Sequence, residues 1–436
     1  MIKLEEKKWP SSPLKAKDLN AEQVKQFLRI RADYEKSAFV NEGQVEVREL
    51  GPAGFSRPIP PGECAISALV LHENGKIYGG AGGKNAHLFF YDPSPDADTV
   101  CPVGVIAANA KVTSLVSGAD NCVYGATAGL DGGNGTIFRY KPCEKLLGET
   151  DFSGRGVREI FDLPAEDQIF YSIVDPCHSA GKIETLIEPV AGEGVADIVI
   201  NNAQLAIYGI SSGSGTLFKY DLASGKVTKL GKADPNGNFS GKLTFDAASG
   251  AVYGAGLYGR IFRINCESGR VDFLTVKAPS LKGRELYNRV TAWVADDIEP
   301  FIYGGTVDGI LFRFDCREEK ILCFGKPVDQ SDIRALTVSN DGTVFGICGE
   351  KGKCCHLFSY CDESRELKDL GMLLARSERP WYGYEISAAV TGKDGRLYFG
   401  EEDRISHIFM YFPPVKKRAK IKHHKESCET DISRNY

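Results

Sequence analysis

Apolar and polar positions recur along this chain as a pair of short motifs. The first motif is an aliphatic residue followed by Tyr-Gly, as at 77–79, and the second is Leu/Ile-Phe-x-Tyr/Phe, as at 88–91. The aromatic of the first motif falls at seven places: Tyr78, Tyr124, Tyr208, Tyr253, Tyr303, Phe345 and Tyr398. The intervals are 42 to 53 residues, apart from one of 84. This period predicts an array of small units that bury their apolar faces against their neighbours.

Each unit is predicted to contain four strands. An inner strand such as 66–70 is followed by the Tyr-Gly strand, then the Leu-Phe strand and an outer strand such as 225–231. The middle strands are apolar on both faces, which is typical of sheets packed between other sheets. Asn-Gly and Asp-Gly pairs, such as 74–75 and 394–395, supply the hairpin turns.

The interval of 84 residues leaves the number of units open. A degenerate copy inside it, at 169–172, 175–176 and 181–186, gives eight units; without it the chain has seven units and one long insertion. We favour eight, with seven as the alternative. The last unit ends at 411–414 without an outer strand, and an outer-type strand near 44–50 can complete it, which closes a ring and removes an exposed edge.

These motifs resemble the β-propeller superfamily, in the quinoprotein-like and kelch-like style. The resemblance covers residues 43–414 and implies an all-β fold, a single β-propeller that binds ligands at the mouth of a central channel. The Trp-Asp signature of WD repeats is absent. Propeller lyases that cleave uronate-containing polysaccharides are similar in architecture and use His, Tyr and Arg on one face. None of their catalytic motifs matches this chain residue by residue.

The two ends of the chain lie outside the repeats. Residues 1–42 form an N-terminal extension with one expected helix near 21–37, because Asn20 and Gln23 fit a capping box. Residues 415–436 form a basic, polar tail that we expect to be disordered. Either end is a candidate docking arm for a protein partner.

Composition and charge indicate which partners and which cellular location to expect. The net charge of -5 and pI near 5.9 give no general attraction to nucleic acid, and no apolar run is long enough to span a membrane. The N-terminus lacks an apolar signal core, and the 13 cysteines are an odd number, so we expect reduced thiols and a cytoplasmic location. The cluster Cys348, Cys354, Cys355 and Cys361 lacks a Cys-x-x-Cys pair, so we expect neither a metal nor a cofactor, and its role stays open.

The repeat aligns the starts of the inner strands, where five units carry a cation at or beside the start. These cations are Lys111, Arg158, Lys242, Arg289 and Arg334. A ring of cations at a narrow mouth would bind carboxylate, sulfate or phosphate groups. The alternative is that they pair with neighbouring acids such as Glu63, Asp332 and Glu385, and serve structure alone.

Aromatic residues precede two of these inner strands. Tyr287 lies before one of them, and the run Trp381, Tyr382, Tyr384 followed by Glu385 lies before the last. Such side chains can stack on a sugar ring, and a Tyr can act as an acid or a base. The alternative is a loop held on the rim by its aromatics.

Three histidines occupy one repeat position, immediately before Leu-Phe or Ile-Phe: His87, His356 and His407. The strand spacing places neighbouring units too far apart for one metal ion to be shared among them. A general base is the remaining chemical role, and these histidines with Tyr384 are the catalytic candidates.

Two functions follow from these residues. The first is a propeller with a cationic, aromatic central pocket for an acidic sugar or another small anion, with a lyase as its catalytic form. The second is a non-catalytic scaffold for protein interaction or a subunit of a larger complex. Fold alone does not choose between them.

Overall fold

A computed structural model describes residues 39–40, 42–50, 59–95, 97–142, 181–234, 239–296, 298–350, 352–376 and 380–414. In these ranges the chain is all-β, with two short 3-10 turns, η3 (Leu257–Gly259) and η4 (Glu285–Tyr287). The expected helix near 21–37 and the basic tail at 415–436 lie outside the described residues.

The strands form five four-stranded antiparallel sheets and one eight-stranded sheet. The eight-stranded sheet is two four-stranded units joined by a single residue pair, Gly82 with Lys111, and we call each four-stranded unit a blade and number the blades along the chain. Blade 1 contains β2 (Ala65–Leu71), β3 (Ile77–Gly82), β4 (Asn85–Asp92) and β5 (Thr99–Ala108). Blade 2 contains β6 (Ala110–Ser117), β7 (Val123–Gly129), β8 (Ile137–Tyr140) and β9 (Ile183–Ile187). Blade 3 contains β10 (Val195–Asn201), β11 (Ala206–Ser211), β12 (Thr216–Asp221) and β13 (Val227–Lys232).

The remaining blades follow the same order. Blade 4 contains β14 (Leu243–Asp246), β15 (Ala251–Ala255), β16 (Arg260–Asn265) and β17 (Val271–Lys277). Blade 5 contains β18 (Val290–Ala295), β19 (Phe301–Thr306), β20 (Leu311–Asp315) and β21 (Lys320–Gly325). Blade 6 contains β22 (Ile333–Val338), β23 (Val344–Cys348), β24 (His356–Cys361) and β25 (Glu366–Met372). Blade 7 contains β28 (Ile386–Thr391), β29 (Leu397–Glu401), β30 (His407–Phe412) and β1 (Gln44–Glu49), and a small ribbon of β26 (Leu374–Ala375) and β27 (Trp381–Tyr382) precedes it.

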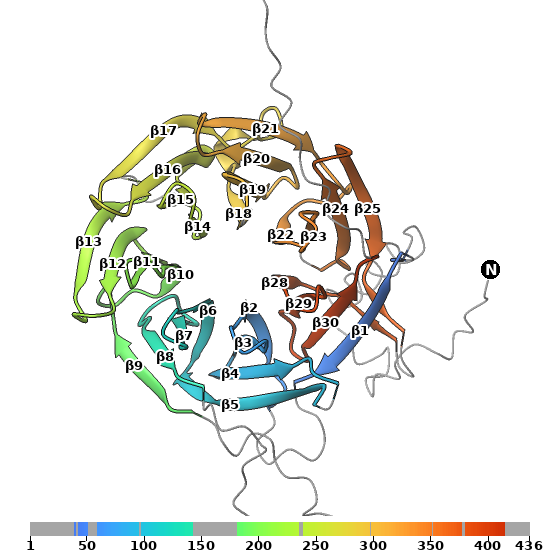
Figure 1. The fold of residues 1–436 in the computed structure, drawn as a ribbon, viewed down its shortest axis with the longest axis horizontal. Helices are drawn as coiled ribbons and strands as arrows, with labels where there is room; N and C mark the ends of the chain where they lie inside the picture. The colour runs from blue at the N-terminus through green and yellow to red at the C-terminus, as the bar shows by residue number, and fades with distance from the viewer. Residues whose placement is uncertain are drawn as a thin grey trace, which may run out of the picture.

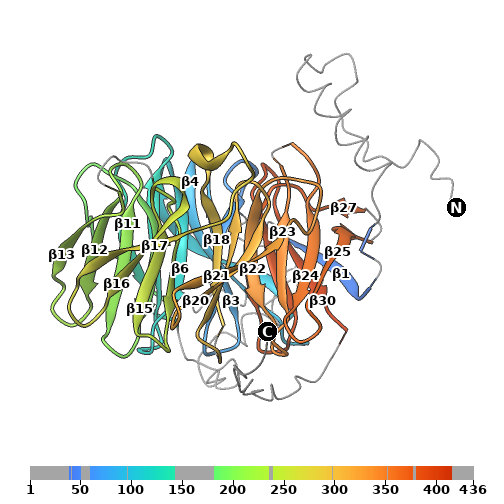
Figure 2. The ribbon, with the colours of Figure 1, turned by 90° about the horizontal axis from the view of Figure 1, so that it is seen from above.

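The blades are arranged in a ring around a central opening, as in a β-propeller (Figure 1). Seen from the side, the ring is a disc (Figure 2). The inner strands of successive blades pack against one another, and β28 of blade 7 packs against β2 of blade 1. β1 pairs antiparallel with β30, so the first strand of the chain completes the last blade.

The described residues form seven blades, and not the eight that we favoured from the sequence. Residues 183–187 are the outer strand β9, which pairs with β8. β10 packs directly against β6, so the described residues form no further blade between blades 2 and 3. The count of eight took residues 181–186 as part of an additional unit, whereas residues 183–187 complete blade 2. Residues 169–172 and 175–176 lie outside the described residues.

The recurring motifs have a common packing reason. In blade 2, Gly125 lies opposite Phe138, and a Cβ on Gly125 would come within 2.2 Å of the phenyl ring. Gly209 and Phe218 repeat this geometry in blade 3, again with 2.2 Å. The glycine of the Tyr-Gly motif therefore makes room for the phenylalanine of the Leu-Phe motif on the neighbouring strand.

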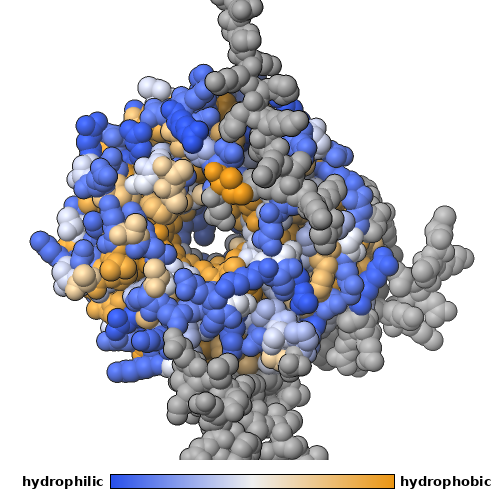
Figure 3. Space-filling view, in the orientation of Figure 1, coloured by the Kyte–Doolittle hydropathy of each residue, from blue (hydrophilic) through white to orange (hydrophobic). Residues whose placement is uncertain are grey.

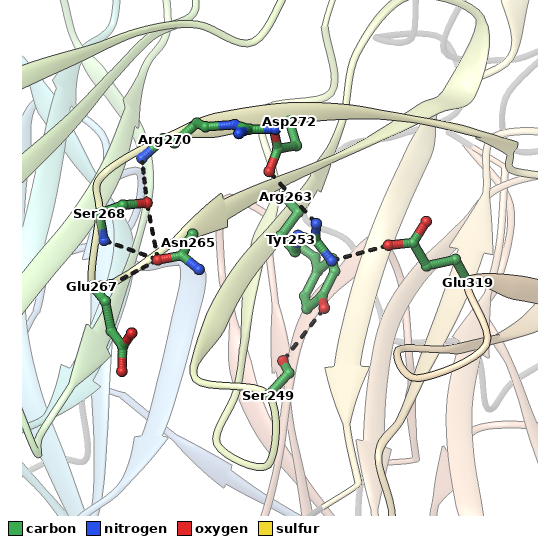
Figure 4. Close-up of polar contacts among 9 residues, drawn as sticks. All are labelled: Ser249, Tyr253, Arg263, Asn265, Glu267, Ser268, Arg270, Asp272 and Glu319. Atoms are coloured by element: carbon green, nitrogen blue, oxygen red, sulfur yellow. Dashed lines mark hydrogen bonds and ion pairs between the residues drawn. The ribbon is translucent and has the colours of Figure 1, made fainter.

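The tyrosine of the first motif is buried between blades and bonds to the turn that precedes its strand. Tyr124 donates its hydroxyl to Asp120 (2.6 Å), and Tyr398 donates to Asp394 (2.9 Å). In blade 4 Tyr253 donates to Ser249 (3.3 Å), while Arg263 bonds Glu319 of blade 5 (2.9 Å; Figure 4). In these three blades the motif thus pairs an apolar ring with a polar end that finds a partner, whereas blade 6 has Phe345 at this position and no hydroxyl.

Candidate functional site

The central channel is lined by residues from all seven inner strands or their starts, around a cavity of about 140 Å³. Its apolar lining includes Leu69, Leu115, Leu243, Trp293 and Leu336. Figure 3 shows the opening from one side, ringed by apolar residues. We call the face at which the inner strands begin the entry face.

Hydroxyl groups link the inner strands of neighbouring blades around this channel. Thr113 of blade 2 donates to the Val195 carbonyl of blade 3 (2.8 Å), and Thr291 of blade 5 donates to Ile333 of blade 6 (2.7 Å). Ser387 of blade 7 donates to Ile66 of blade 1 (3.1 Å). Two further bonds complete this hydroxyl belt: Ser67 to Val112, and Ser240 to Val290.

A β-bulge orients four of these five side chains. Ser67, Thr113, Thr291 and Ser387 each occupy the extra residue of a β-bulge near the start of an inner strand. A bulged residue is turned out of the regular alternation, so its side chain can reach the adjacent sheet. Together with Ser240, which precedes β14, these residues place a hydroxyl bond at five of the seven blade interfaces.

Near the starts of the inner strands, charged residues take the place of the hydroxyl at the other two interfaces; at the far end of the strands, Thr391 of blade 7 donates to Val338 of blade 6 (2.8 Å). Between blades 3 and 4, Asp197 accepts from the backbone N–H of Leu243 (2.9 Å) and from that of Ile198 (2.9 Å). Burial raises the pKa of Asp197, although the charge of Lys242 opposes the rise. Its carboxyl therefore holds a proton to a higher pH than an exposed aspartate.

Between blades 6 and 7 the bulged residue is Arg334. Its guanidinium lies 3.5 Å from Glu402 of blade 7, and Lys111 of blade 2 lies 3.5 Å from the other oxygen of the same carboxylate. Two of the expected cations are therefore brought together at the entry face, where one acid partly neutralises both. Glu402 is not one of the three acids that the sequence analysis named as partners for these cations.

Lys242 differs from these two cations. It lines the channel beside Asp197, and among the described residues no carboxylate lies within ion-pair distance of its ammonium. Arg289 is exposed on the entry face, and its charge acts on Asp332 together with that of Arg334. Arg158 lies outside the described residues.

Asp332 sits at the start of β22 in a left-handed backbone conformation, with φ +68°. Burial raises the pKa of Asp332, and Arg334 opposes the rise. One of its carboxylate oxygens is buried without a hydrogen-bond partner. Perturbed acids of this kind gather at binding sites more often than elsewhere.

The expected aromatic residues do not meet at one place. Tyr287 is 67% exposed on η4, whereas Trp381 is half-buried on β27, with its ring centroid 4.1 Å from that of His407. Tyr382 pairs with Leu374 and has its ring near Phe39. Tyr384 donates its backbone N–H to Glu401, and Glu385 accepts from the backbone of Glu402. The aromatic run at 381–384 thus packs mainly on blade 7.

Each of the three histidines has its own carboxylate. His87 bonds Glu63 (2.7 Å), His356 bonds Asp369 (3.2 Å), and His407 bonds Glu401 (2.9 Å). All three imidazoles are buried and none lines the channel. They join the third strand of blades 1, 6 and 7 to another segment of the same blade, and the structure does not bring them to the cations.

The cysteines in the described part of the chain are free thiols. Burial raises the pKa of Cys348 to about 12 and that of Cys355 to about 11, so both stay protonated near neutral pH. Within the described residues no group of three or more His, Cys, Asp or Glu is placed to hold a metal ion. No helix of the described part is long and apolar enough to cross a bilayer.

The sequence reasoning missed two sets of residues that join the blades near the channel. Ser67, Thr113, Thr291 and Ser387 of the hydroxyl belt each follow an aligned strand start by one residue, and the small hydroxyl side chains at that position were a visible signal. Asp197 lies two residues after its strand start, away from the positions at which the cations align.

Comparison with known proteins shows the fold alone. No protein-family model matches the chain, and no curated protein matches it. Many solved structures match, among them the extracellular domain of a one-component system from B. thetaiotaomicron, with a TM-score of 0.52 and 13% identity. The match covers 86% of this chain and 41% of that one, so this chain spans less than half of that structure.

The match corrects one expectation from the sequence. A cytoplasmic location was inferred from the absence of a signal core and from the odd number of cysteines. The similar structure is an extracellular domain, which contradicts that location. Free thiols and the first residues of a sequence are weak guides to the compartment, because neither is tied to the fold.

Proposed function

We propose that the protein binds a small hydroxylated acid in its central channel. The observation that carries this proposal is Lys242, a cation in the channel wall whose charge no carboxylate of the described residues neutralises at ion-pair distance. Arg334 lines the same cavity, with Glu402 on one side of its guanidinium. A ligand carboxylate between these two cations would complete the charge balance.

The hydroxyl belt indicates the rest of the ligand. Ser67, Thr113, Thr291 and Ser387 line the channel and already donate their protons to carbonyl groups. Their oxygens can still accept hydrogen bonds. A ligand with hydroxyl donors beside its carboxylate, such as a hydroxy acid or one acidic sugar, matches this set of acceptors and cations.

The size of the cavity limits the ligand. Sites for drug-sized molecules are about 300–1,000 Å³, whereas the channel cavity is about 140 Å³. A single small acid fits this space better than an oligosaccharide. Since the candidate bases are buried in pairs with carboxylates and lie away from the channel lining, we propose binding without a lyase reaction.

The experiment is titration calorimetry with galacturonate, glucuronate and lactate, and with galactose and sulfate as partial mimics. We expect a uronate or lactate to bind more tightly than galactose or sulfate, since only the first group has both the carboxylate and the hydroxyls. Lys242→Met should weaken binding about tenfold or more, or ~1.4 kcal/mol. Lys229→Met, on the exposed outer strand of blade 3, is the matched control. No binding at millimolar concentration, or equal affinity in both variants, would overturn the proposal.

A further inference from the structure

The connection between blades 4 and 5 holds large apolar side chains in water. It runs from β17 to β18 through η4, and it packs beside η3. Leu286 is 69% exposed and Tyr287 is 67% exposed, and Leu281 and Tyr258 beside them are 39% and 38% exposed. A golden coil above one face of the disc in Figure 2 corresponds to this segment.

Buried polar groups fix this connection in place. Asn288, which is 3% exposed, donates its side-chain N–H to the carbonyl of Ala278 (2.7 Å). Arg284 bonds Asp308 (2.6 Å), whose side chain is 2% exposed, and the same carboxylate accepts from the backbone of Leu281 (3.3 Å). A loop without a role in recognition does not need such anchors to keep Leu286 and Tyr287 solvent-exposed.

The neighbouring turn carries backbone strain. Tyr258, in η3, has φ +58° and ψ 29°, the left-handed region that a bulky residue seldom occupies. Gly259 follows it and ties η3 to the connection, since its carbonyl accepts from the backbone N–H of Ala278 (2.8 Å). Strained residues cluster at binding surfaces, where the surrounding structure holds them.

Cations surround the apolar residues. Lys277, Lys282, Arg284 and Arg289 are exposed in this connection, against one acid, Glu285. Arg284 is paired with Asp308, but no carboxylate of the described residues lies within ion-pair distance of the other three. The patch is therefore locally positive on a chain whose net charge is -5.

We propose that this patch, made of Tyr258, Leu281, Lys282, Leu286, Tyr287 and Arg289, is a docking surface for an acidic segment of a partner protein that carries apolar side chains. Tyr and Arg are the residues that most often dominate the binding energy of protein interfaces. An acidic segment would meet the local cations while its apolar residues cover Leu286 and Tyr287. This inference is independent of the ligand proposed for the channel.

The charge of the whole chain favours a protein segment over two other occupants. An anionic lipid surface is extended, so it would meet the net negative charge of the chain as well as the patch. A second copy of this chain carries the same net charge of -5. A short segment meets the patch alone.

Selection from a library of short random peptides tests the proposal while the partner is unidentified. The wild-type protein is the bait, and the library is first depleted on the double variant Leu286→Ser, Tyr287→Ser. We expect enriched peptides to combine Asp or Glu with Leu, Phe or Trp. Failure to enrich acidic, apolar peptides overturns the proposal.

Fluorescence anisotropy with the most enriched peptide then measures affinity. The double variant and the charge reversal Lys282→Glu, Arg289→Glu should each bind about tenfold more weakly, or ~1.4 kcal/mol. Added salt should weaken binding to the wild type, because the cations are exposed. Leu130→Ser is the matched control, since Leu130 is 59% exposed on blade 2 of the same face. An equal loss in this control overturns the proposal.

Two further measurements separate the other occupants. Sedimentation with vesicles of phosphatidylserine and phosphatidylcholine, and light scattering over a range of protein concentrations, are repeated with the double variant. Binding to vesicles, or a dimer, that the double variant abolishes would assign the patch to a membrane or to self-association and overturn the proposal. The double variant should keep the melting temperature and the channel affinity of the wild type, because its altered side chains are exposed.

Discussion

Two kinds of interface join the blades: one is linked by a hydroxyl group near the start of the inner strand, and the other has a charged side chain there. At five interfaces a hydroxyl near the start of an inner strand donates to a carbonyl of the next blade. At the other two, Asp197 and Arg334 occupy this level and bring charge into the wall of the channel, while Thr391 still donates to Val338 at the far end of the inner strands of blades 6 and 7. Since a hydroxyl suffices for the ring, the charges exceed what the architecture requires. The desolvation of a buried charge is costly, which points to recognition as the reason for keeping it.

The largest expected effect is at Asp197. Asp197→Ala leaves the N–H groups of Ile198 and Leu243 without their acceptor in a buried position. The free energy of unfolding should fall by about 3 kcal/mol, measured by urea titration. Glu184→Ala removes an exposed acid paired with Arg139 and should change it by about 0.5 kcal/mol or less. Equal effects in the two variants would show that Asp197 does not link the blades.

The second effect is a pH dependence. The pKa of Asp197 is raised in the folded state, so between the ordinary carboxyl pKa and the raised value the folded state binds more protons than the unfolded state. The contribution of Asp197 to stability should therefore fall as pH rises through this window, by at most about 1.4 kcal/mol per pH unit. Asp197→Asn should flatten the slope, while Asp332 and Glu401, whose pKa values are also raised by burial, keep a slope of the same sign. The free energy of unfolding is measured from about pH 4 to pH 7 in the wild type and in Asp197→Asn. The same slope against pH in both proteins would contradict this assignment.

A hydroxyl interface should be weaker than the Asp197 interface. Thr113→Val keeps the shape of the side chain and removes its bond to the carbonyl of Val195. We expect a loss of about 1 kcal/mol in the free energy of unfolding. Thr228→Val, on the exposed outer strand of blade 3, is the control and should change it little. If Thr113→Val costs as much as Asp197→Ala, the distinction between the two kinds of interface is wrong.

The smallest effect tests whether a hydroxyl can replace a charge. Arg334→Thr places a hydroxyl at the bulge, where it can donate to the carbonyl of Ile386 as its counterparts do in other blades. Stability should stay within about 0.5 kcal/mol of the wild type, whereas calorimetry should show weaker binding of the acid. Arg334→Ala lacks the hydroxyl and should be the less stable variant. Equal stability of the two variants would rule out the replacement.

The sequence predicted the strands of this fold better than it predicted the number of blades. The Tyr-Gly and Leu-Phe motifs were visible because Gly125 and Phe138 must fit each other across two strands, and each repeat preserves that fit. The count of eight differs from the seven blades of the described residues because residues 183–187 were assigned to an additional unit, and only the pairing of β9 with β8 places them in blade 2. For the candidate site, the sequence singled out Lys111, Lys242 and Arg334, but it did not predict that Glu402 pairs with Lys111 and Arg334.

Local chemistry along the chain determined one part of this structure, and the closure of the ring determined the other. The amino-acid sequence by itself determined a repeated all-β unit, because strand periodicity and the paired motifs depend on residues near one another in the chain. Only the tertiary structure decided that Lys111 and Arg334 share Glu402 while Lys242 has no such carboxylate among the described residues. Those contacts join blades that are far apart in the chain, so their distances follow from the closure of the ring.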